Sequence, residues 1–194
     1  MKKVVYIHGL NSSCKIFNHL MSCMPDHEKI LINYQSSAPI EESYNTIIKK
    51  IPKNQDVSII GHSLGGILAT LISSRNESID ISEIVTISTP FGGSDHARFL
   101  KWLYPSFKVF ADITPRSPII KEIQLANNFP KMISLISVGG NLNVMSGKND
   151  GVVSVESQKV SPAVKKIEID SNHFEILQDE KTIKEVKKFV FKAK

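Results

Sequence analysis

The sequence predicts an α/β fold, in which about six mostly parallel strands carry helices on both faces of one sheet. Short apolar runs alternate with helical patterns along most of the chain. The apolar runs are nearly continuous, as in strands that are buried on both faces of a parallel sheet. Strands joined by helical crossovers form such a sheet between two helical layers, and their sites lie at the carboxyl ends of the strands.

Six strands are expected, over residues 4–8, 29–34, 57–61, 81–88, 133–138 and 164–169. Four regular helices are expected, over residues 14–24, 39–51, 64–74 and 180–191. Ser12 or Ser13 would cap the first helix, and Pro25 would end it. Apolar residues recur at helical spacing in the second and the last helix, which indicates one buried face on each.

The alternation breaks between residues 95 and 130, a segment with several aromatic residues and four prolines. This stretch is too long for an ordinary connection in a compact domain. We expect a helical insertion (95–130) folded over the active-site face as a lid or cap, within a single domain that spans residues 1–194. Its aromatic side chains either pack the insertion onto the sheet or line an acyl pocket.

Composition excludes several classes of function. The 194 residues carry a formal charge of +5 without a dense basic block, so nucleic-acid binding is not expected. Cys14 and Cys23 would lie about 13 Å apart in one helix, too far for a disulfide, which favours free thiols and a cytoplasmic location. No apolar run has the length of a signal peptide core or a membrane span. No metal-ligand spacing or cofactor motif is present, so no cofactor and no metal are expected.

The most informative motif is Gly-x-Ser-x-Gly at residues 61–65, with Ser63 at its centre. It lies between an expected strand and an expected helix, the context of a nucleophile elbow. So sharp a turn forces Ser63 into a strained backbone conformation and brings Gly61 and Gly65 together, where only glycine avoids a clash. The alternative is an ordinary turn that happens to hold a serine.

A nucleophilic serine needs a base and an acid that orients the base, and the elbow predicts the chain order Ser, acid, His. Only His96 and His173 follow Ser63, and His173 directly follows the last expected strand. We therefore expect His173 as the base, against the alternative of a solvated loop histidine. Asp150, in a turn-forming Gly- and Asn-rich loop, is the expected acid; a simple turn aspartate is its alternative. The remaining acid candidates are Asp170 and Asp112.

Two backbone N–H groups would form an oxyanion hole. One belongs to Leu64, the residue after the nucleophile, and the other comes from the loop after an early strand, where Leu10 follows Gly9. The flanking histidines, His8 and His62, are expected to support the site by packing and hydrogen bonding.

At these residues the chain resembles the α/β-hydrolase superfamily, and within it the small lipases and carboxylesterases. The matching segments follow the family's order and are His8-Gly9, Gly61-His62-Ser63-Leu64-Gly65-Gly66, Thr89-Pro90-Phe91-Gly92-Gly93-Ser94, Asp150-Gly151-Val152-Val153 and Asn172-His173. The resemblance implies that Ser63 is the nucleophile, Asp150 the acid and His173 the base. The first strand matches the family's third, which implies a minimal six-stranded core.

The resulting hypothesis is a serine hydrolase that cleaves carboxylic esters, of small molecules or lipids, through an acyl-enzyme. The alternatives on the same scaffold are an acyltransferase or thioesterase, which would use the same triad, and a non-catalytic binding module. The mild positive charge and the aromatic insertion also permit transient contact with a membrane surface.

Overall fold

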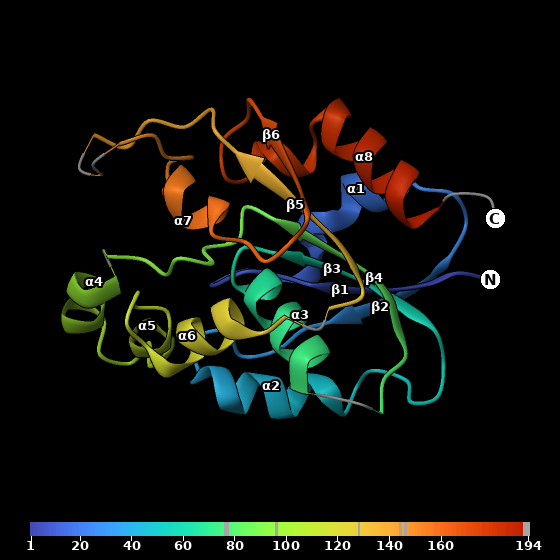
Figure 1. Cartoon of the computed structure of the whole chain (residues 1–194), viewed down its shortest axis with the longest axis horizontal. Coiled ribbons are helices and arrows are strands. Elements are labelled where there is room, and N and C mark those ends of the chain that lie inside the picture. The colour runs from blue at the N-terminus through green and yellow to red at the C-terminus, as the bar shows by residue number, and fades with distance from the viewer. Residues whose placement is uncertain (76–77, 96, 128, 144, 146, 192–194) are drawn as a thin grey trace.

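A fully parallel sheet forms the centre of the protein, which is described here as a computed structural model (Figure 1). The structure describes residues 1–75, 78–95, 97–127, 129–143, 145 and 147–191. Within them the sheet has six strands in the order β2-β1-β3-β4-β5-β6. The strands are β1 (Lys3–Ile7), β2 (Glu28–Ile32), β3 (Val57–His62), β4 (Ile81–Ile87), β5 (Lys131–Ser137) and β6 (Lys165–Ile169). The predicted fold class is confirmed, and every neighbouring pair of these strands is parallel.

Helices connect the strands. The described α-helices are α1 (Asn18–Ser22), α2 (Ile40–Ile48), α3 (Leu64–Arg75), α4 (Ala97–Leu103), α5 (Val109–Asp112), α6 (Pro118–Leu125), α7 (Val155–Lys159) and α8 (Glu180–Val190), and two 3-10 turns, η1 (Cys14–Phe17) and η2 (Glu175–Leu177), accompany them. The sequence did not predict α7. Among the described residues, none of these helices combines the length and the apolar character needed to cross a bilayer.

The expected helix over residues 14–24 is instead a 3-10 turn followed by the short helix α1. Ser13 stands at the N-cap of η1 but its side chain makes no capping bond, and the Ser12 hydroxyl contacts the Ser13 carbonyl, so the predicted cap is wrong. Both cysteines are free, as predicted. The Cys14 thiol is buried and points at the carbonyl oxygens of Tyr6 and Ile32, which ties η1 to the sheet.

Two apolar clusters lie on opposite faces of the sheet. Figure 1 shows α2, α3 and α6 on one face and α1 with α8 on the other. Alternate residues of β1 illustrate the division, because Val5 and Ile7 belong to the first cluster and Val4 and Tyr6 to the second. Each central strand is therefore buried on both sides, which explains its continuous apolar sequence.

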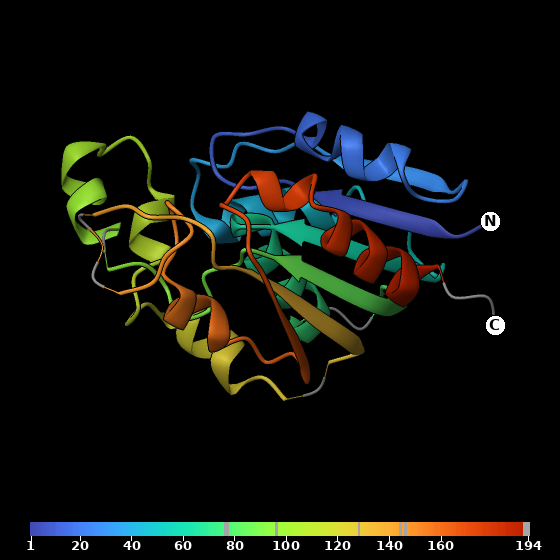
Figure 2. The same cartoon turned by 90° about the horizontal axis from the view of Figure 1, so that it is seen from above.

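The segment over residues 95–130 divides into two parts. Buried side chains of α6, such as Ile120 and Ile123, join the cluster around α3, so α6 is the crossover helix between β4 and β5. In both views α4 lies at the end of the molecule away from the termini, beyond the carboxyl ends of the strands (Figure 2). A role of α4 and α5 as a lid remains a proposal.

Candidate active site

Ser63 occupies the tight turn between β3 and α3. Its φ of +53° lies in the left-handed region, which costs a non-glycine residue about 1–3 kcal/mol. The turn is held on two sides, because the Ser63 amide donates to the carbonyl of Ile87 over 2.8 Å and its carbonyl accepts from the Gly66 amide over 2.9 Å. The chain thus presents the Ser63 side chain at the carboxyl end of the sheet and at the start of a helix.

The glycines of the motif are required by close backbone contacts. A Cβ at Gly61 would lie 2.4 Å from the Gly65 carbonyl oxygen, and a Cβ at Gly65 would lie 2.0 Å from the Ile7 carbonyl oxygen. The two glycines therefore approach each other as the motif predicts, and the turn is pressed against the end of β1. A Cβ at Gly66 would meet the Thr89 side chain at 1.9 Å.

The folded chain brings His173 and Asp150 together in a buried pair. His173 follows β6, Asp150 lies in the loop after β5, and His173 Nδ1 lies 2.7 Å from Asp150 Oδ2. The His173 amide also donates to the Asp150 carbonyl over 2.9 Å, so the two loops are joined by backbone as well. Both side chains are almost wholly buried.

Asp150 remains ionised in this buried position because many donors surround it. Its Oδ1 accepts from the amides of Val152 and Val153, and its Oδ2 accepts from Ser137 Oγ and Gln158 Nε2 in addition to the imidazole. Burial alone raises the pKa of Asp150, but the hydrogen bonds and the positive charge that His173 can carry outweigh it and hold the pKa below its ordinary value.

The other acid candidates lie elsewhere. Asp112 accepts from the Ile40 amide over 2.8 Å and so satisfies a free N–H at the start of α2, which makes it wrong as a partner of His173. Asp170 is exposed, whereas the His173 ring bonds Asp150. His96, the other candidate base, lies outside the described residues.

His62 connects Ser63 with His173. The His62 and His173 rings are 4.8 Å apart, and His62 Nε2 lies 2.8 Å from the His173 carbonyl oxygen. Among the described residues, no hydrogen bond joins Ser63 Oγ directly to the His173 ring. The link between the two is His62, the residue before Ser63, whose ring bonds the backbone of His173. His62 packs and hydrogen-bonds as expected of a supporting residue.

The loop after β1 passes directly against Ser63. A Cβ at Gly9 would lie 2.9 Å from Ser63 Cβ, so the backbone at Gly9, the residue before Leu10, passes close to the turn. The Leu10 side chain packs against the apolar cluster. Leu64 begins α3, so its N–H is one of the helix's free amides. His8 supports the same loop, since its ring stacks on Tyr34 at 4.5 Å and its Nδ1 contacts the Gly9 carbonyl.

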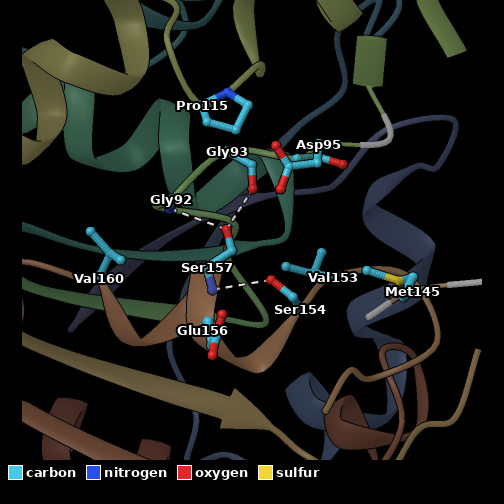
Figure 3. Close-up of a pocket in the computed structure, with 11 residues that line it drawn as sticks. Gly92, Gly93, Asp95, Pro115, Met145, Val153, Ser154, Glu156, Ser157 and Val160 are labelled. Carbon is cyan, nitrogen blue, oxygen red and sulfur yellow. Dashed lines mark hydrogen bonds between the residues drawn. The ribbon is translucent and has the colours of Figure 1, made fainter. Parts of the chain in front are cut away.

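Two cavities flank the acid loop. One, of about 380 Å³, is lined by Gly139, Gly140, Asn141, Asp150, Gly151, Val152, Asn172, His173 and Phe174. The other, of about 300 Å³, lies between the loop after β4 and α7, and Ser157 is among the lining residues drawn in Figure 3. Among the described residues, no three His, Cys, Asp or Glu side chains gather as a metal ion would require.

Sequence reasoning missed the polar side chains that hold the acid. Ser137 is the last residue of β5, and Gln158 lies on α7. A five-residue helix is too short to show helical periodicity, so α7 left no such signal in the sequence. Ser154 at its N-cap, which accepts from the Ser157 amide, was the local feature that could have indicated it.

Known proteins share this architecture. The model of the PGAP1-like alpha/beta domain family matches residues 28–166. Among solved structures, a gene lin2722 product from Listeria innocua is 15% identical, and the match covers 100% of this chain and 95% of that protein's chain with a TM-score of 0.70. A lipase-esterase related protein from Clostridium acetobutylicum is 14% identical, with 97% and 94% covered and a TM-score of 0.63. The Bacillus licheniformis lipase BlEst2 is 16% identical, with 95% and 90% covered and a TM-score of 0.66. No curated protein matches the chain.

Proposed function

We propose that the chain, which belongs to the PGAP1-like α/β domain family within the α/β-hydrolase superfamily, is a serine ester hydrolase. Ser63 is the nucleophile, His173 the base and Asp150 the acid. The observation that carries the proposal is the buried pair of His173 and Asp150, delivered by two separate loops next to the strained turn that presents Ser63. Substrates are carboxylic esters of small molecules or lipids.

The proposed reaction follows from the protonation of the pair. His173 Nδ1–H donates to Asp150, so in the neutral imidazole Nε2 has a free lone pair. Nε2 takes the proton of Ser63 Oγ as that oxygen attacks the ester carbonyl carbon. The negative charge on the carbonyl oxygen is bound by the N–H groups of Leu64 and Leu10, and Asp150 stabilises the imidazolium.

The tetrahedral species then breaks down. The carbon–oxygen bond to the alcohol cleaves, the alcohol leaves with the proton from His173, and Ser63 retains the acyl group as an ester. Water, deprotonated by His173, attacks the acyl-enzyme in the same way and releases the carboxylic acid and the free serine. No redox step occurs: the original Ser63 proton leaves on the alcohol, and the proton that His173 takes from water restores the serine hydroxyl.

Labelling of Ser63 tests the proposal directly. A fluorophosphonate probe should modify Ser63, as located by peptide mass spectrometry, and p-nitrophenyl esters of short, medium and long acyl chains should be hydrolysed. Ser63→Ala should abolish both. Asp150→Asn should keep the shape of the site but lower kcat by about 10⁴-fold, because the wrong imidazole tautomer is held. Adding a competing alcohol to the assay distinguishes the two reactions, because hydrolysis releases the free acid whereas acyl transfer forms a new ester of the added alcohol.

Absence of labelling together with absence of turnover would contradict the proposal, as would a Ser63→Ala variant with full activity. Such a result would favour a non-catalytic role of the scaffold.

A further inference from the structure

Gln158 joins the acid loop to the end of β5. The side chain lies in α7 and is fully buried. Its Nε2 lies 3.1 Å from Asp150 Oδ2 and 3.2 Å from the Ser137 carbonyl oxygen, and its Oε1 lies 3.0 Å from the Ser137 backbone nitrogen. Because the Ser137 backbone N–H can only donate, Oε1 must face it. The backbone of β5 therefore fixes the amide so that Nε2 donates to Asp150.

The same carboxylate oxygen receives a second neutral donor from β5. Ser137 Oγ lies 2.5 Å from Asp150 Oδ2 and 3.3 Å from Gln158 Oε1, so its single proton goes to the carboxylate. Ser88 Oγ lies 2.7 Å from Ser137 Oγ and must then donate to it. Asp150 Oδ2 thus meets donors from Ser137 and Gln158 as well as from His173.

The helix that carries Gln158 is anchored on its other side. Ser157 Oγ donates to the Gly93 carbonyl over 2.6 Å and accepts from the Gly92 amide over 3.1 Å, contacts that Figure 3 shows. A Cβ at Gly92 would lie 2.9 Å from Ser157 Cα, so only glycine permits this approach. Ser154 caps the helix by accepting from the Ser157 amide. The loop after β4 therefore holds α7 in place next to Asp150.

We propose that Gln158 is a positioning residue, whose amide, held by Ser137, orients the Asp150 carboxylate so that Oδ2 accepts from His173 Nδ1. The catalytic consequence of this role rests on the proposed function. A carboxylate fixed by Gln158 and Ser137 cannot rotate away from the imidazole, and the tautomer of His173 that can act as a base is kept.

Glutamine has the length and the neutrality that this position needs. A glutamate would bring a second carboxyl group to about 3 Å from Asp150, where two like charges oppose each other's ionisation. A methionine of similar length would fill the space but would donate nothing. The titratable groups that face Asp150 are His173, from the loop after β6, and His62, at the end of β3, and neither changes in these variants.

The titration of the Asp150 carboxyl carbon tests the positioning role of Gln158 independently of any catalytic activity. In protein labelled with ¹³C-aspartate, the titration midpoint of Asp150 should rise by about one pH unit in Gln158→Met, because a hydrogen bond to the charged form is lost. Ester hydrolysis by the same variant should show kcat lowered about tenfold with KM within about twofold.

Ser154→Ala is the matched control, because it removes the cap of α7 and touches no atom of Asp150. Its Asp150 midpoint and its kcat should equal those of the wild type. Gln158→Glu provides a second test if Gln158→Met does not fold. The activity of this variant should fall as its introduced carboxyl group ionises, which adds a descending limb to the pH profile that the wild type lacks.

An unchanged Asp150 midpoint and kcat in Gln158→Met would overturn the proposal, and so would equal shifts in Ser154→Ala, since Gln158 would then only support α7. If the methionine variant does not fold, a Gln158→Glu profile without the added limb overturns it. A wild type that hydrolyses no ester would refute the proposed function, while the Asp150 titration in Gln158→Met would still decide the positioning role.

Discussion

His62 donates a hydrogen bond from Nε2 to the backbone carbonyl of His173 over 2.8 Å. The residue before the proposed nucleophile thus holds the backbone of the proposed base. His62 Nδ1 is buried and has no partner among the described residues. Burial, followed by the charge that His173 can carry, lowers the pKa of His62 to about 3. The ring is therefore neutral at and above pH 5, and its single proton stays on Nε2.

This depressed pKa predicts a pH dependence of stability. Between pH 6.5 and pH 3 the unfolded chain binds a proton at His62 that the folded protein does not, so the free energy of unfolding falls as the pH falls through this window. Between pH 8 and pH 5 the loss from this residue is about 2 kcal/mol. Urea unfolding at the two pH values measures it.

His62→Gln is the matched variant, because glutamine keeps an N–H donor for the His173 carbonyl but does not titrate. Its free energy of unfolding should change less between pH 8 and pH 5 than that of the wild type, by about 2 kcal/mol. Burial also lowers the pKa of His8, which makes the free energy of unfolding fall with pH in the same direction. Part of the pH dependence should therefore persist in His62→Gln. Equal pH dependence in both proteins would contradict the assignment.

The sheet and the elbow could be predicted because their signals are local. Continuous apolar runs mark strands that are buried on both faces, and glycines two positions before and after Ser63 mark a turn that no other residue fits. The chain order of the elbow then selected His173 and Asp150 from a short list, and the structure brings those two together.

The residues around the acid could not be predicted in this way. Gln158 acts through contacts with Ser137 and Asp150, 21 and 8 positions away in the chain, and no spacing rule relates the three. Asp112 shows the opposite case. It lies between Ser63 and His173 in the chain, as the acid should, but its carboxylate accepts from the Ile40 amide at the start of α2. Tertiary contacts of single polar side chains leave no period in a sequence.

Gly65→Ala should destabilise the fold strongly. The added Cβ would lie 2.0 Å from the Ile7 carbonyl oxygen, a backbone atom that cannot move without displacing β1. We expect a loss of about 3 kcal/mol or more in the free energy of unfolding. Gly147→Ala is the control, since φ there is +76° but nothing lies within 4 Å of the new Cβ, and it should cost only about 1 kcal/mol. Similar losses in both variants would contradict the close contact.

Arg75, the last residue of α3, links this helix to α6 and α2, and its two contacts should contribute unequally to stability. The guanidinium forms a two-point contact with Glu122 of α6, with Nε and Nη2 each 2.5 Å from a carboxylate oxygen, and a further contact with Glu41 of α2. Glu122→Gln should lower the free energy of unfolding by about 1 kcal/mol, and less in high salt. Glu41→Gln should cost less, because Glu41 is more exposed than Glu122. A larger loss for Glu41→Gln would refute this ranking.

We propose that α4 and the residues after it contact lipid surfaces and act with α5 as a lid. Residues 101–106 are all exposed, among them Trp102 at 78%, Leu103 at 47% and Tyr104 at 49%. Lys101 adds positive charge beside these apolar side chains, and Lys108 follows nearby. Aromatic and aliphatic side chains with basic flanks bind at the boundary of anionic bilayers.

The double variant Trp102→Ser/Leu103→Ser should lose most of its flotation with vesicles of phosphatidylserine and phosphatidylcholine, and the wild type should float less with phosphatidylcholine alone, because the basic residues then attract no anionic headgroup. Leu125→Ser is the matched control, since Leu125 is 81% exposed at the end of α6, outside this segment, and its loss should leave flotation unchanged. Hydrolysis of a short, soluble ester should be equal in all three proteins, because the segment meets the lipid rather than the reacting atoms. A wild type that remains with the unbound protein on anionic vesicles ends this proposal and leaves the ester hydrolase proposal untouched.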